Sequence, residues 1–166
     1  MVDVYVSIGS NIDREKHVSA AVAALKTRYS GFRRSSVYES PAVGFHGDPF
    51  YNLVVEFQTD DSVHAVATQL HELETLQGRS RGEQSFAPRT LDLDLLLYGR
   101  SIIREEGLQL PRDEILKYAF VLLPLSEIAA DERHPLLGST YAQLWDGFDQ
   151  SSQSIWKVSV AALACD

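Results

Sequence analysis

Residues 91–98 begin with an alternation of leucine and aspartate, and this pattern limits the possible fold more than any other segment. Because side chains alternate between the two faces of a β-strand, it predicts a strand with one buried and one polar face. The buried face would carry the odd-numbered leucines, Leu91, Leu93, Leu95 and Leu97. Asp92 and Asp94 would share the opposite face, roughly 7 Å apart along the strand. The sequence therefore predicts a half-buried strand that presents a pair of carboxylates.

The hydrophobic periodicity of the preceding residues predicts three more strands and two helices. We expect strands over residues 2–8, 32–38 and 50–57, and amphipathic helices after Asp13 and over residues 63–73. The order β-α-β-β-α-β predicts the α+β class and, within it, a ferredoxin-like sandwich. Both helices would cover one face of an antiparallel sheet, which leaves the other face for a site.

The pattern weakens beyond residue 100, where we expect a C-terminal extension. Helices are expected over residues 119–128 and 141–145, and a last strand over residues 156–160. The chain has 166 residues, which suits a single domain over residues 1–166. We expect it to act as a monomer.

Composition excludes several classes of protein. The formal net charge is −8, which argues against nucleic acid as a partner, because nucleic-acid binders neutralise phosphates with basic side chains. Cys165 is the only cysteine, so an internal disulfide cannot form. The chain holds no run of about 18 apolar residues and begins with a strand pattern rather than a signal peptide. We therefore expect a cytoplasmic protein without membrane contact.

The carboxylate pair needs a cation, because neighbouring negative charges repel each other. Two Mg²⁺ ions roughly 4 Å apart, bridged by phosphate oxygens, would neutralise Asp92 and Asp94. Arg79, Arg81 and Arg89 precede them in a basic segment, and guanidinium groups beside carboxylates suit phosphoryl transfer. The alternative is a solvated loop next to a solvated strand face, which only keeps the protein soluble.

The third expected strand carries a candidate pocket for a flat heteroaromatic ligand. Phe50 and Asn52 would share one face, where the ring can stack on a heterocycle and the amide can bond to its edge. The other candidates are backbone groups and a second ring: Ser40, Pro41, Val43 and Phe120. The alternative is that the phenylalanines belong to the core and the asparagine to a turn.

The strings at residues 5–11, 39–44, 50–52 and 87–94 resemble the hydroxymethyldihydropterin pyrophosphokinase family of folate biosynthesis. The last string, Ala-Pro-Arg-Thr-Leu-Asp-Leu-Asp, is close to the signature of that family. The resemblance runs from about residue 4 to about residue 129. It implies transfer of a pyrophosphoryl group from ATP to the hydroxymethyl oxygen of 6-hydroxymethyl-7,8-dihydropterin, with release of AMP.

The resemblance also implies a role for each candidate residue. Two Mg²⁺ ions would bridge Asp92 and Asp94 to the ATP phosphates. The pterin would lie between Phe50 and Phe120 and bond to Asn52, with backbone contacts at Ser40, Pro41 and Val43. The implied catalytic residues are Arg79, Arg89, Asp92 and Asp94, and the implied ATP contacts are Glu74, Arg81, Phe86, Arg89 and Arg112.

Departures from the family pattern gather on the implied nucleotide side. Arg112 stands where the family usually has a histidine, Gly107 and Tyr118 where it has arginines, and Phe86 where it has a tryptophan. Arg112 restores one positive charge, although a guanidinium does not replace an imidazole. The chain is then either a divergent active enzyme or a paralogue that binds a pterin with weak or no activity. A pterin-binding module without catalysis and a structural domain that pairs through a sheet edge are further alternatives.

Overall fold

The computed structural model describes residues 1–42, 47–78 and 90–163. Its elements in chain order are β1 (Val2–Ser10), α1 (Arg14–Arg28), β2 (Ser30–Arg34), β3 (Val37–Ser40), β4 (Phe50–Thr59), α2 (Val63–Leu76), β5 (Asp92–Tyr98), β6 (Ile103–Glu105), β7 (Leu108–Leu110), α3 (Glu114–Lys117), α4 (Ala119–Ile128), α5 (Tyr141–Asp146), the 3-10 turn η1 (Gln150–Ser152), β8 (Trp156–Val158) and the 3-10 turn η2 (Ala161–Leu163). No helix in these described ranges is long and apolar enough to cross a membrane.

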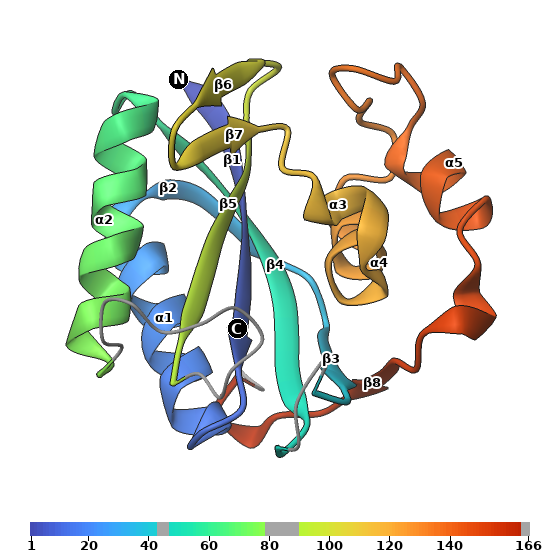
Figure 1. Cartoon of the computed structure of the whole chain (residues 1–166). Helices are drawn as coiled ribbons and strands as arrows, with labels where there is room; N and C mark the ends of the chain where they lie inside the picture. Colours follow the sequence, from blue (N-terminus) through green and yellow to red (C-terminus); the bar gives the residue numbers. More distant parts are fainter. Residues whose placement is uncertain (43–46, 79–89, 164–166) are drawn as a thin grey trace.

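The centre of the fold is an antiparallel sheet in the order β5-β1-β4-β3-β8, with β2 also paired to β4 (Figure 1). β6 and β7 form a separate hairpin. This arrangement confirms the expected α+β class. The predicted strand over residues 32–38 is instead two strands, because the Ser35 hydroxyl, rather than a backbone carbonyl, accepts the Val54 N–H at 3.0 Å.

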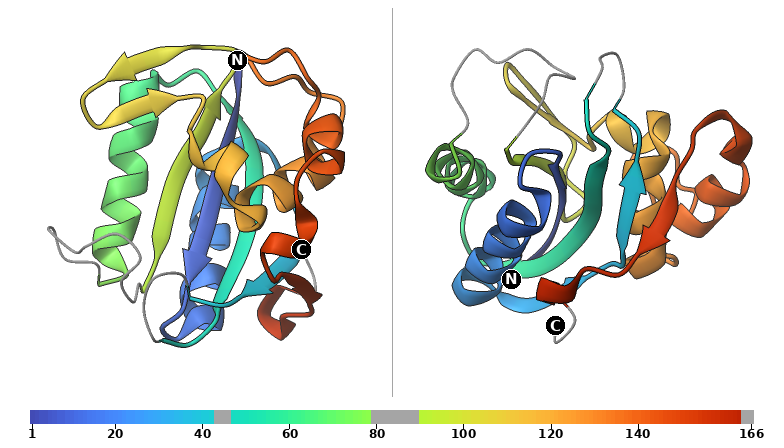
Figure 2. Two further views of the ribbon diagram at one scale, coloured as in Figure 1. Left: turned by 45° about the vertical axis from the view of Figure 1, so that its right-hand side comes forward. Right: turned by 90° about the horizontal axis from the view of Figure 1, so that it is seen from below.

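Helices cover both faces of the sheet, as the view from below in Figure 2 shows. On one face α1 and α2 bury residues such as Leu25 and Leu70 against Val6 of β1. On the other face α4 buries Leu122 in a second cluster with Val54 of β4. Because α4 covers much of the second face, that face is not left open as a whole. The aspartates do lie on it, since Asp94 is opposite Ser7 of β1, and Ser7 is opposite Val54. The site must lie towards an end of the sheet.

β5 is irregular, and this corrects one part of the expected leucine face. Tyr5 lies opposite Leu97, while the next residue of β1, Val6, lies opposite Leu95, so Leu96 is an extra residue in β5. Such a bulge reverses the faces beyond it. Leu91, Leu93 and Leu95 pack in the first cluster, whereas Leu96 and Leu97 pack in the second. The placement of Leu97 with the other odd-numbered leucines was wrong.

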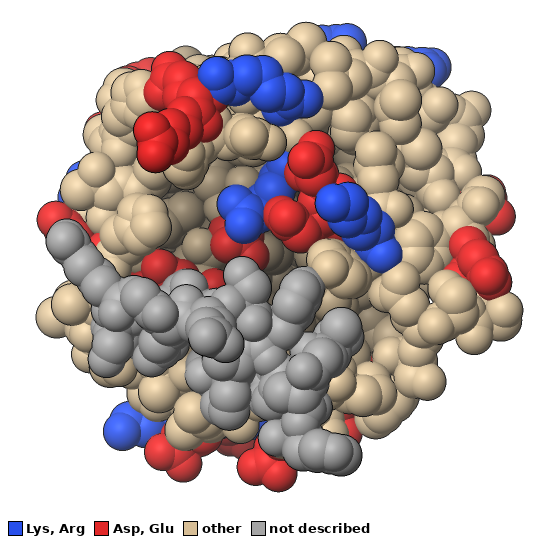
Figure 3. All heavy atoms as spheres, in the orientation of Figure 1, with Lys and Arg blue, Asp and Glu red and all other residues tan. Residues whose placement is uncertain are grey.

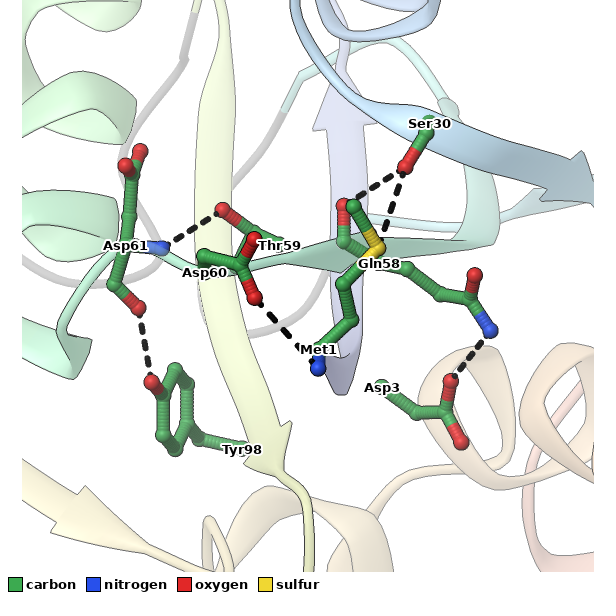
Figure 4. A network of polar contacts seen from close by, with 8 residues as sticks. All are labelled: Met1, Asp3, Ser30, Gln58, Thr59, Asp60, Asp61 and Tyr98. Carbon is green, nitrogen blue, oxygen red and sulfur yellow. Dashed lines mark hydrogen bonds and ion pairs between the residues drawn. The ribbon is translucent and has the colours of Figure 1, made fainter.

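A network of polar contacts closes the end of the sheet where β1 begins (Figure 4). The N-terminal amine lies 3.3 Å from Asp60 Oδ1, Gln58 Nε2 donates to Asp3 Oδ1 at 3.0 Å, and the Tyr98 hydroxyl donates to the Asp61 carbonyl at 2.7 Å. The side chains that bear on function lie at the opposite end, where β1 finishes.

Candidate active site

A row of residues crosses three strands at the end of β1. In the antiparallel register, Gly9 of β1 lies opposite Asp92 of β5 on one side and opposite Asn52 of β4 on the other. Directly opposed residues share a face of the sheet. Gly9 has no side chain, so the row has a gap at its middle. A Cβ added at Gly9 would lie 3.6 Å from Asn52 Oδ1 and 3.8 Å from Phe50 Cδ1, so the gap opens toward both candidate pterin residues.

Asp94 lies further along β5 and forms an ion pair with Arg112. The distance from Arg112 Nη2 to Asp94 Oδ1 is 3.2 Å, and Arg112 Nε contacts Glu114 Oε2 of α3. Figure 3 shows acidic and basic side chains lying against one another at a hollow in this face of the molecule. Burial and the Asp92 carboxylate raise the pKa of Asp94 to about 7, although Arg112 acts in the opposite direction. The guanidinium therefore opposes, but does not cancel, the combined effect of burial and of the Asp92 carboxylate.

The backbone fixes Arg112 next to β5. Its N–H donates to the Leu96 carbonyl at 3.1 Å, and its own carbonyl accepts the Ile115 N–H at 3.2 Å. Pro111 alone separates Arg112 from the end of β7 at Leu110. The hairpin β6-β7, which we did not predict, thus returns the chain to β5 and delivers this arginine to the carboxylates.

Glu74 belongs to α2 and is 4% exposed. Its Oε2 accepts the backbone N–H of Leu93 at 2.8 Å, and Leu93 separates the two aspartates. His71 Nδ1 lies 3.5 Å from the other carboxylate oxygen of Glu74. The residue implied as an ATP contact thus also fixes the strand that carries the carboxylates.

Asn52 is held in one orientation by its neighbours. The side chain is 5% exposed, and its Nδ2 donates to Ser40 Oγ at 2.8 Å and to the Tyr38 carbonyl at 3.3 Å. With the amide nitrogen turned toward β3, Oδ1 faces the gap at Gly9. Ser40 lies opposite Phe50 in the sheet. Three of the expected pterin residues therefore meet at one place.

Two of the remaining candidates, Phe120 and Pro41, are among the described residues. Phe120 is half-buried on α4 and stacks on Tyr118, with ring centroids 4.9 Å apart and planes 21° apart. Pro41 is exposed just after β3. Five candidates lie outside the described residues and stay predictions: Val43, Arg79, Arg81, Phe86 and Arg89.

Sequence reasoning missed two features of the site. It ended the first strand at residue 8 and expected Gly9 to turn the chain, whereas Gly9 lies inside β1, where a glycine often marks a close approach. It also gave no partner to Glu114, whose contact with Arg112 depends on where the chain returns after β7.

The protein is therefore an α+β domain with a candidate active site at one end of its sheet. There, paired carboxylates lie beside an amide that faces an open gap. A family model described as 7,8-dihydro-6-hydroxymethylpterin-pyrophosphokinase (HPPK) matches residues 5–130. The chain belongs to this family.

Two bacterial relatives, both named 2-amino-4-hydroxy-6-hydroxymethyldihydropteridine pyrophosphokinase, match most of the chain. The Bacillus subtilis protein is 34% identical over 158 residues, which cover 92% of this chain and 89% of the relative. The Haemophilus influenzae protein is 34% identical over 135 residues, which cover 79% of this chain and 84% of the relative.

Longer proteins also contain a matching region. The folic acid synthesis protein fol1 of Pneumocystis carinii is 34% identical over 146 residues, and this match spans 86% of this chain but only 20% of that protein. The crystal structure of wild-type Plasmodium falciparum HPPK-DHPS superposes with a TM-score of 0.66 at 12% identity, covering 88% of this chain and 44% of that one. At this identity the structural likeness concerns the fold alone.

Proposed function

We propose that this chain transfers a pyrophosphoryl group from ATP to the hydroxymethyl oxygen of 6-hydroxymethyl-7,8-dihydropterin and releases AMP. Membership of the HPPK family supports pyrophosphoryl transfer in folate biosynthesis and does not favour a paralogue with weak or no activity. The observation that carries the proposal is the position of Asp92, next to the gap that Asn52 faces. A cation site and a heterocycle site would then adjoin, as transfer between ATP and a pterin requires.

The described residues fit Mg²⁺ held between protein and substrate. Mg²⁺ in such sites is bound by one or two carboxylates together with phosphate oxygens, rather than by a cage of protein ligands. Within the described ranges no group of three or more His, Cys, Asp or Glu side chains has metal-binding geometry. When bound, two Mg²⁺ ions supply positive charge to the phosphate oxygens.

The protein's own residues would orient the two substrates. Asn52 has its amide nitrogen engaged by Ser40 and Tyr38, so its Oδ1 would accept an N–H from the pterin edge. The Phe50 ring would offer a stacking surface beside the gap. Arg112 would add positive charge near the phosphates. Holding both reactants in line is the main task of the protein in phosphoryl transfer.

Several finer features belong to this proposal. The strand order β5-β1-β4-β3 supports a ferredoxin-like sandwich with a C-terminal extension that contributes β8. A single domain over residues 1–166, a cytoplasmic location and a monomeric state stay predictions.

An assay of AMP release tests the proposed function. The reduced pterin alcohol, ATP and Mg²⁺ together should give AMP, and omission of any one of them should abolish it. A pterin-binding module without catalysis would bind the pterin equally well with or without Mg-ATP and form no AMP. A structural domain would bind neither ligand.

A further inference from the structure

Arg112 is a basic side chain that contacts Asp94, one of the two proposed metal ligands. Its Nη2 lies 3.2 Å from Asp94 Oδ1, which is a distance for direct charge pairing. A carboxylate oxygen that accepts a hydrogen bond from a guanidinium is less available to a metal ion. The guanidinium and the metal ion also repel each other, because both are positively charged. A divalent cation at Asp94 must therefore displace Arg112 or bind against its charge.

The backbone of Arg112 is held in place, whereas its side chain is partly exposed. Hydrogen bonds to Leu96 and from Ile115 fix the backbone beside β5. The side chain is 36% exposed, so its guanidinium can reach the hollow without unpacking a core. Glu114 contacts Nε, which leaves the terminal nitrogens to exchange partners. Exchange of the partner at Nη2 therefore need not disturb the contact at Nε.

The charges around Arg112 favour such an exchange once substrate arrives. Asp94, Glu114 and Asp92 all attract the Arg112 guanidinium. Divalent cations would cancel the attraction of the aspartates, and the bound triphosphate would supply new acceptors that a guanidinium binds well.

We propose, resting on the proposed function, that the Arg112 guanidinium takes the place of a metal ion at Asp94, a stand-in role. It pairs with Asp94 before substrate binds. When Mg²⁺ binds Asp94, the guanidinium moves to the nucleotide phosphates. Arg112 is then a positioning residue for both metal and nucleotide. It opposes metal binding before the nucleotide arrives and supports nucleotide binding afterwards.

The test measures Mn²⁺ binding, as a probe of the Mg²⁺ site, by electron paramagnetic resonance in the absence of pterin. Arg112→Met removes the charge and keeps most of the apolar stem. Without nucleotide, this variant should bind Mn²⁺ about 5- to 10-fold more tightly than the wild type. With a non-hydrolysable ATP analogue and saturating Mg²⁺, the same variant should bind the analogue at least about 10-fold more weakly. A merely structural role would weaken both.

Arg100→Met is the matched control, because it makes the same change in net charge at an exposed residue after β5. It should leave both affinities at the wild-type value. Arg112→Lys covers the case in which the methionine variant does not fold: the retained charge should keep Mn²⁺ affinity near the wild-type value while analogue binding weakens.

Unchanged or weaker Mn²⁺ binding by Arg112→Met would overturn the stand-in role. The role would also be overturned if Arg112→Lys, which keeps the charge, bound Mn²⁺ as tightly as Arg112→Met is expected to. Either result would leave the pyrophosphokinase proposal intact as long as the wild type releases AMP. A wild type that binds no Mn²⁺ even with the analogue, and releases no AMP, would overturn both proposals.

Discussion

The Glu74 carboxylate of α2 accepts the backbone N–H of Leu93 in β5 at 2.8 Å. β5 is an edge of the central sheet, so this N–H points away from β1 and would otherwise lack a strand partner. Leu93 lies between Asp92 and Asp94, and the helix thus holds the strand at the place where its two carboxylates project. Burial of a third carboxylate beside that pair adds to the local negative charge and helps to raise the pKa of Asp94.

The first prediction concerns this hydrogen bond. Glu74→Ala should lower the free energy of unfolding by roughly 1–3 kcal/mol, because it leaves a buried N–H without its acceptor. Glu74→Gln keeps an acceptor oxygen and should lose less. Urea denaturation followed by circular dichroism measures both. Equal stability of Glu74→Ala and the wild type would show that the bond does not hold the strand.

The second prediction concerns the gap at Gly9. A Cβ there makes only ordinary van der Waals contacts, so Gly9→Ala should fold normally. The added methyl group would occupy the space next to Asn52 Oδ1, and we expect pterin affinity to fall about 10-fold, or ~1.4 kcal/mol. Fluorescence titration with the pterin measures this change.

Gly147→Ala is the control for the Gly9 variant. A Cβ at Gly147 would meet its nearest atom, the Gln143 carbonyl oxygen, at the same 3.6 Å, but at the end of α5. This variant should bind the pterin as the wild type does. If Gly9→Ala also kept full pterin affinity, the ligand would have to lie elsewhere.

The third prediction concerns the orientation of Asn52. Ser40→Ala removes the acceptor at 2.8 Å and leaves Nδ2 with the longer contact to the Tyr38 carbonyl. The amide should then rotate more freely and present Oδ1 less often. We expect the KM for the pterin to rise about 3- to 10-fold, as loss of one hydrogen bond implies, while the KM for ATP stays constant. A change confined to ATP would place Asn52 outside the pterin site.

Much of the fold before residue 100 was predictable because its hydrophobic periods are strong and local: Val63–Leu76 contains the second predicted helix. Residues 119–128 also form α4 as expected, although the pattern is weaker there. Asp13 precedes α1 as expected, but it has a φ of 44° and forms no side-chain capping bond. Local pattern therefore places a helix more reliably than it describes how the helix begins.

The errors concern features that depend on distant parts of the chain. The bulge at Leu96 is a property of the pairing between β5 and β1, and the break at Ser35 depends on Val54 of β4. The strands β6 and β7 have three residues each, too few for a recognisable alternation. Since that hairpin delivers Arg112, sequence reasoning could name the arginine but could not pair it with Asp94.

The proposed function depends most on the two aspartates of β5 as holders of divalent cations against a triphosphate. AMP formation at saturating ATP, Mg²⁺ and reduced pterin alcohol should be measured for Asp92→Asn and Asp94→Asn. Asp60→Asn is the control, because the exposed carboxylate of Asp60 pairs with the N-terminus at the far end of the sheet. We predict that each β5 variant folds but loses at least about 10³-fold in rate, because charge neutralisation and positioning carry the reaction. The control should keep the wild-type rate. Wild-type rates in both β5 variants would contradict the assignment of the metal site.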